Sequence, residues 1–169
     1  MDQHLKLRSM AIAGAAAMLA IPAGAAAETA SSSLGVTATV TENCTVSTAP
    51  VAFGSVDTLS GGNVDATGGV TVTCTNGTPW SASASAGTGT GASLTTRRMV
   101  SGANLLNYSL YTDSARTSVW GDGTATTANV ENTGSGSAQT FTVYGRVMSG
   151  QASAPAGSYS DTVSVTISY

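Results

Sequence analysis

The chain has 169 residues, enough for one domain, with 41% hydrophobic and 9% charged residues and a formal net charge of −3. Its nine acidic side chains outnumber its six basic ones. Because a nucleic-acid binder needs a clustered basic surface that displaces counterions, this balance excludes a nucleic-acid partner.

The first 27 residues have the pattern of a secretory signal peptide. Lys6 and Arg8 form a positive start, residues 10–19 form an apolar stretch, and residues 25–27 form an Ala-Ala-Ala cleavage site. An uncleaved membrane anchor is the alternative, but the run is mostly Ala and Gly with Pro22, which is weakly apolar for a spanning helix. We expect cleavage before Glu28, with export through the periplasm.

The mature chain begins with a short alternating run. Four apolar residues recur at every second position, Leu34, Val36, Ala38 and Val40. Alternation of this kind predicts a β-strand with one buried face. The run can complete a sandwich within its own chain, or it can be inserted into a neighbouring molecule and make a polymer. Periodicity alone favours the first arrangement, because most domains complete themselves, but it does not distinguish the two.

Six further strands are predicted, separated by stretches rich in Gly, Ser, Thr and Asn, and no amphipathic helix is found after residue 27. Asn76-Gly77 predicts a tight turn, and Pro50 predicts an interruption in the first of the six strands. The strands contain, in chain order, Val46–Phe53, Val70–Cys74, Trp80–Ala86, Leu106–Leu110, Phe141–Val147 and Val163–Tyr169. Their number and spacing predict an all-β protein with an immunoglobulin-like β-sandwich.

The last predicted strand shows the strongest alternation. Val163, Val165, Ile167 and Tyr169 lie on one face, with Thr and Ser residues between them. Because this strand stands last in the sequence, we expect its outer edge to be unpaired. An unpaired, apolar-faced edge must be covered or used for pairing with another chain.

The two cysteines, Cys44 and Cys74, both lie in the mature part beside predicted strands. In an oxidising compartment, such a pair predicts one structural disulfide. A spacing of 30 residues is not that of a redox CxxC pair, and two Cys without His do not form a usual structural zinc site. We expect no metal and no cofactor.

An enzymatic function is not expected. The only His and the only Lys, His4 and Lys6, lie in the leader, so a Ser nucleophile has neither of its usual bases. Asp113 and Asp122 are the one neighbouring carboxylate pair with aromatic company, and they are expected to stabilise turns. Arg97-Arg98 is interpreted as a solvated loop pair.

Several motifs, in order, resemble the spore coat protein U domain family. They are Leu110-Tyr111-Thr112-Asp113, Trp120-Gly121-Asp122-Gly123, Thr142-Val143-Tyr144-Gly145-Arg146-Val147 and the ending from Pro155 to Tyr169. That family includes subunits of archaic, Csu-type chaperone–usher pili. The resemblance implies an incomplete sandwich of six strands whose groove receives a donor strand from the next subunit.

The resemblance implies three parts of the chain: a signal peptide (1–27), an N-terminal donor-strand segment (28–43) and a pilin-like β-sandwich domain (44–169). Leu34, Val36, Ala38 and Val40 would be the donor residues. The acceptor edge, which would also bind a chaperone, would be the terminal strand with Val163, Val165, Ile167 and Tyr169, facing the first strand near Cys44–Phe53.

The implied function is that of a structural subunit of a surface fibre, or pilus, that supports adhesion and biofilm formation. Its partners would be neighbouring subunits, a periplasmic chaperone and an outer-membrane usher. Because the mature chain has no Lys, the polymer would be non-covalent. The alternatives are a secreted coat or matrix protein, and a monomeric binding module with a self-completed sandwich in which Trp80, Trp120 and Tyr144 form a sugar platform.

Overall fold

The computed structural model describes residues 24, 26–59 and 61–169, so the predicted leader lies almost entirely outside the described residues. The chain divides into two units, Met1–Ala38 and Thr39–Tyr169. In the first unit, the described residues lie in no strand and are all exposed to solvent. The expected N-terminal strand is therefore not formed within this chain.

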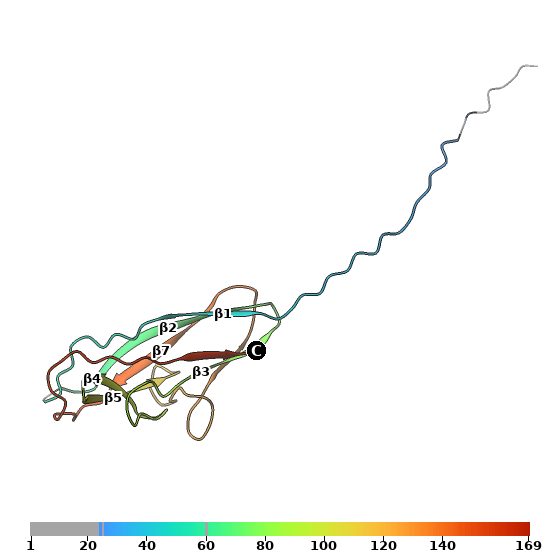
Figure 1. Ribbon diagram of the computed structural model, residues 1–169. Helices are drawn as coiled ribbons and strands as arrows, with labels where there is room; N and C mark the ends of the chain where they lie inside the picture. The colour runs from blue at the N-terminus through green and yellow to red at the C-terminus, as the bar shows by residue number, and fades with distance from the viewer. Residues whose placement is uncertain (1–23, 25, 60) are drawn as a thin grey trace, which may run out of the picture. The chain divides into compact units, whose positions relative to one another are not determined.

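The second unit is a sandwich of two antiparallel sheets (Figure 1). The larger sheet contains, in spatial order, β1 (Cys44–Ala49), β2 (Val64–Cys74), β7 (Gln139–Val147), β5 (Asn104–Tyr111) and β4 (Arg97–Ser101). The smaller sheet contains β6 (Val130–Thr133), β3 (Pro79–Ala84) and β8 (Val165–Ser168). The predicted fold class, an all-β immunoglobulin-like sandwich, is confirmed.

The core is formed by the alternating apolar residues of the central strands. On β2, Val70, Val72 and Cys74 are each at most 2% exposed, whereas the intervening Thr71 and Thr73 are only half-buried. This is the result of the two-residue period of a strand, which places successive side chains on opposite faces. The same alternation buries Leu106, Tyr108 and Leu110 on β5, and Trp80, Ala82 and Ala84 on β3.

The six predicted strands are observed, but their ends differ from the predicted ones by up to six residues, as at the start of β2. β1 ends at Ala49, directly before Pro50, which has no N–H to continue the ladder. The turn between β2 and β3 contains Asn76 and Gly77, and Gly77 has a φ of 86°, a conformation that a residue with a Cβ rarely adopts. In the C-terminal segment only Val165–Ser168 form a strand, which is shorter than the run from Val163 to Tyr169.

Two short strands, β4 and β6, are additional to the six that were expected. β4 pairs with β5 from Arg97↔Tyr108 to Ser101↔Asn104, and β6 pairs with β3 over four residues. Both are edge strands with little alternation in their sequences, Arg-Arg-Met-Val-Ser and Val-Glu-Asn-Thr. They form because an already folded neighbour offers unpaired backbone groups, which is a tertiary effect that sequence periodicity does not record.

Candidate functional site: an apolar groove between two sheet edges

Two free strand edges face each other across the sandwich. β1 is the first strand of the larger sheet and hydrogen-bonds only to β2, while β8 is the last strand of the smaller sheet and hydrogen-bonds only to β3. In Figure 1 the C-terminal strand lies beside β3, in agreement with this pairing. Within the described part of the chain, each edge therefore has a row of backbone groups without a strand partner.

A groove of about 340 Å³ lies between these edges. One wall includes Thr48 and Ala49 at the end of β1, and the other includes Val163, which precedes β8, and Val165, the first residue of β8. The floor includes buried apolar side chains from the larger sheet and from the loop before β6, among them Val70, Leu110, Trp120 and Val143. Since one water occupies ~30 Å³ in the liquid, the groove has room for several side chains and is more than a packing defect.

The floor of the groove is held rigidly by Trp120. Its indole Nε1 donates to the carbonyl oxygen of Ala82 at 3.1 Å, and its ring packs edge-on against Phe141 with 5.6 Å between ring centroids. Its backbone N–H donates to the carbonyl of Leu110 at 2.8 Å. These contacts fix the floor before anything enters the groove, so an occupant would meet a preformed surface.

The four residues predicted for the acceptor edge lie in different places. Val163 and Val165 line the groove. Ile167 is half-buried and packs against the core cluster, whereas Tyr169 is 57% exposed and lies outside the groove lining.

Asp161 is a polar residue in the groove lining, and its carboxylate is saturated with donors. It accepts hydrogen bonds from the backbone N–H and hydroxyl of Thr88 at 2.7 and 2.8 Å, from the Tyr108 hydroxyl at 2.7 Å and from the N–H of Thr162 at 2.7 Å. Burial opposes its charged form, but these hydrogen bonds outweigh burial and lower the pKa of Asp161. Burial, helped by Asp161, raises the pKa of Tyr108, which stays neutral.

The prediction for Arg97 as a solvated loop residue is wrong. Arg97 begins β4, is fully buried and donates to the carbonyls of Ser85, Leu94 and Trp120 at 2.9, 2.9 and 2.7 Å. Burial lowers its pKa. Its guanidinium ties three backbone segments together beneath the floor of the groove. Two adjacent Arg residues after a Ser/Thr-rich stretch give no periodic signal, so the sequence did not reveal this role.

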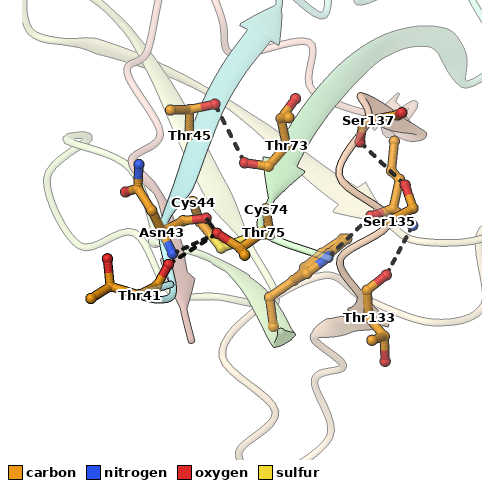
Figure 2. The surroundings of a disulfide bond; sticks show 12 residues. Thr41, Asn43, Cys44, Thr45, Thr73, Cys74, Thr75, Thr133, Ser135 and Ser137 are labelled. Atoms are coloured by element: carbon orange, nitrogen blue, oxygen red, sulfur yellow. Dashed lines mark hydrogen bonds between the residues drawn. A yellow bond between two sulfur atoms is a disulfide. The ribbon is translucent and has the colours of Figure 1, made fainter. Parts of the chain in front are cut away.

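The predicted disulfide is confirmed. Cys44 and Cys74 are bonded and stand opposite each other in the β1–β2 register. Next to the disulfide, the backbone N–H of Thr75 donates to the carbonyl of Asn43 at 2.9 Å, and the N–H of Asn43 donates to the Thr75 hydroxyl at 3.1 Å (Figure 2). The point at which the N-terminal segment enters the sandwich domain is therefore fixed to β2.

The residues predicted to form the donor segment are presented to solvent. Leu34, Val36 and Val40 are 89%, 85% and 83% exposed, and the run from Leu34 to Val40 lies in no strand. Exposed large aliphatic side chains at three alternating positions are costly in water, because each loses the free energy that burial would provide. The segment therefore has the alternating pattern of a β-strand but pairs with no sheet in the described chain.

The candidate carboxylate pair is used in turns, as predicted. Asp113 accepts hydrogen bonds from Thr117 and Ser118, and Asp122 accepts them from Thr124 and Thr127. These hydrogen bonds lower the pKa of both carboxyl groups. In the part of the chain that the structure describes, no group of three or more His, Cys, Asp or Glu residues could hold a metal ion. The same part contains no helix with the length and hydropathy that crossing a membrane requires.

Comparison with known structures shows the fold. The chain is similar to one chain of the crystal structure of the CsuC–CsuE chaperone–tip adhesion subunit pre-assembly complex from archaic chaperone–usher Csu pili of Acinetobacter baumannii. The two chains are 23% identical with a TM-score of 0.55, and the match covers 78% of this chain and 40% of the other. Comparison with curated protein sequences found no significant match.

The family model for the Spore Coat Protein U domain matches residues 30–166. The matched region contains nearly all of the sandwich domain together with the exposed alternating run. The chain therefore belongs to the Spore Coat Protein U domain family.

Proposed function

We propose that this protein is a structural subunit of a secreted surface fibre that assembles by non-covalent donor-strand exchange. The observation that carries the proposal is a mismatch within one chain. The sandwich has a groove with an apolar floor between two unpaired edges, while the run from Leu34 to Val40 has the alternation of a strand but is exposed and pairs with nothing in the described chain.

The physical basis of the proposal is β-augmentation. A strand inserted between β1 and β8 would receive backbone hydrogen bonds from both edges, which gives affinity that depends little on sequence. Burying Leu34, Val36 and Val40 contributes ~1.5–3 kcal/mol each, or about 5–9 kcal/mol of gross stabilisation for each junction. Insertion of one subunit's segment into the next joins two different surfaces, so the assembly need not close and a filament results.

The proposal includes assembly partners. An apolar groove with unpaired edges would aggregate if it were left uncovered, so a periplasmic chaperone would cover it and an outer-membrane usher would exchange the chaperone for the next subunit. The similarity to a chain of a chaperone–tip adhesion subunit pre-assembly complex supports these partners. The fibre would stand on the cell surface and support adhesion and biofilm formation.

Gel electrophoresis without heating tests the proposal. The double variant Val36→Asp/Val40→Asp should be secreted as a monomer and should give no ladder of multimers, because a charge cannot enter the apolar groove without a large desolvation cost. The matched control is Thr37→Asp/Thr39→Asp, whose side chains lie on the opposite face of an inserted strand and should leave the ladder intact. An undiminished ladder from the first variant would refute the proposal.

Secretion as a self-completed coat protein or binding module predicts a different result. Such a protein would remain monomeric with its wild-type sequence. Trp80 and Trp120, two of the three residues considered for a sugar platform, are 4% and 2% exposed, so they form no aromatic platform on the outer surface. No observation on the described residues favours this second function.

A further inference from the structure

Strand β1 would connect the two junctions that a subunit makes with its neighbours. Its first residue, Cys44, follows directly on the N-terminal segment, which would lie in one neighbour. Its last residues, Thr48 and Ala49, form part of the groove wall that would hold the segment of the other neighbour. Tension applied to one junction would therefore act on the wall of the next.

β1 by itself is poorly suited to resist tension. It is an edge strand that hydrogen-bonds only to β2, and every residue after Cys44 in this strand is exposed. Strands with few buried contacts are the first to open locally. If β1 separated from β2, the groove would lose one wall and the strand held there would be released.

The disulfide provides a second route for the tension. It joins Cys44, the first residue of β1, to Cys74, the last residue of β2. β2 pairs with β1 on one side and with β7 over nine residues on the other, from Val64↔Val147 to Val72↔Gln139. A force that reaches Cys44 is thus transmitted by a covalent bond to a central strand before it reaches the rest of β1.

Thr75 extends this connection beyond the disulfide. Besides the hydrogen bonds that link its backbone N–H and its hydroxyl oxygen to Asn43, its hydroxyl proton has two acceptors within reach, the carbonyl oxygens of Asn43 at 3.3 Å and of Thr41 at 3.4 Å (Figure 2). The carbonyl of Cys74 in turn accepts from the N–H of Gly136 at 3.1 Å, which fixes the loop between β6 and β7 to the same place. The exit of the N-terminal segment is therefore tied to two parts of the sandwich.

We propose that the disulfide and Thr75 form an N-terminal clamp that diverts tension from β1 into β2, so that pulling on one junction does not open the groove at the next. This inference rests on the proposed function, since tension enters at Asn43 only if residues 34–40 are held by a neighbour. Thr75 is a positioning residue in this mechanism. It acts by holding the backbone of residues 41–43 and touches no donor strand.

Constant-force single-molecule measurements on multimers of the full-length chain test the clamp. Reducing the disulfide in assembled multimers should shorten the lifetime of a junction under tension by about tenfold or more. Thr75→Val, which keeps the shape and removes the hydroxyl, should shorten it by about three- to tenfold, and Thr75→Ser, which restores a hydroxyl, should return it to the wild-type value. Full extension of a reduced subunit should exceed that of an oxidised one by about 100 Å, which reports the state of the disulfide in each trace.

A parallel measurement without tension separates the clamp from a general effect on stability. Dissociation of unloaded multimers, followed by size-exclusion chromatography, should be unchanged within about twofold for both Thr75 variants. Equal losses with and without tension, or no loss under tension, would overturn the clamp and leave donor-strand exchange standing. Failure of the wild-type chain to form multimers would overturn both.

Discussion

Removing two methyl groups from one donor position gives a quantitative test of how the groove recognises its occupant. Val36 is 85% exposed in the free chain, so nearly all of its side chain is available for burial on binding. Val36→Ala removes about two methylene equivalents at ~0.8 kcal/mol each, or about 1.6 kcal/mol. The predicted result is an increase in the dissociation constant by about fifteenfold.

The assay uses a fluorescent peptide of residues 29–40 and a full-length subunit whose own segment carries Val36→Asp and Val40→Asp. That subunit keeps its groove but cannot fill the groove of another copy. Fluorescence anisotropy then measures binding of the wild-type peptide, the Val36→Ala peptide and a control Thr37→Ala peptide. Thr37 would face away from the groove, so its peptide should bind within about twofold of wild type.

The comparison between the two altered peptides decides the matter. If Val36→Ala and Thr37→Ala weakened binding equally, the groove would not distinguish the two faces of the alternating peptide. Recognition would then come from the backbone alone, and the account of Leu34, Val36 and Val40 as buried residues would be refuted.

Four further predictions concern the sandwich domain. Val165→Asp places a charge in the groove wall and should abolish binding of the wild-type peptide, measured by anisotropy, while the variant chain still donates its own segment to a wild-type groove. Arg97→Met removes a buried cation from three well-formed hydrogen bonds to carbonyls and should lower the free energy of unfolding in urea by about 3 kcal/mol or more, whereas Arg97→Lys should recover part of the loss. Replacing Cys44 and Cys74 by Ser should lower that free energy by about 3.5 kcal/mol, the value for a closed loop of this length, and an unchanged urea midpoint would contradict it. The pKa of Asp161 is lowered in the folded state, so its contribution to stability is present above the unfolded pKa of about 3.9 and is lost as the pH falls through the folded pKa. Urea unfolding between pH 7 and pH 2 should therefore show a smaller decrease in the free energy of unfolding for Asp161→Asn than for wild type.

The sequence was sufficient for the central strands because their burial follows a strict period. Val70, Val72 and Cys74 alternate with Thr, and all three are buried in β2. The turn at Asn76-Gly77 was equally predictable, because these residues restrict the backbone locally. Pro50 was predicted only to interrupt the first strand, whereas β1 ends before it and the expected continuation to Phe53 is not formed.

Features that depend on distant parts of the chain were not predictable. Arg97 is buried because carbonyls from positions 85, 94 and 120 converge on it, and no local pattern records that convergence. β4 and β6 form on the edges of strands that fold for other reasons. The positions of the predicted acceptor residues also depend on the rest of the fold. Val163 and Val165 line the groove, whereas Tyr169 lies beyond the last hydrogen-bonded pair of β8 and is exposed.

The alternation of the N-terminal run did not distinguish pairing inside the chain, which periodicity alone favoured, from pairing between chains. A period of two specifies which face a strand buries, but it does not specify the molecule that provides the partner. The exposure of Leu34, Val36 and Val40 in the isolated chain is the observation that favours pairing with another molecule.

The most direct measurement is a cryo-electron microscopy map of the assembled fibre at a resolution that separates strands. Residues 34–40 of each subunit should form a strand between β1 and β8 of the adjacent subunit, with Val36 and Val40 pointing to the floor formed by Val70 and Trp120. A map in which this run pairs with its own sandwich, or in which the groove between β1 and β8 is empty, would contradict the account.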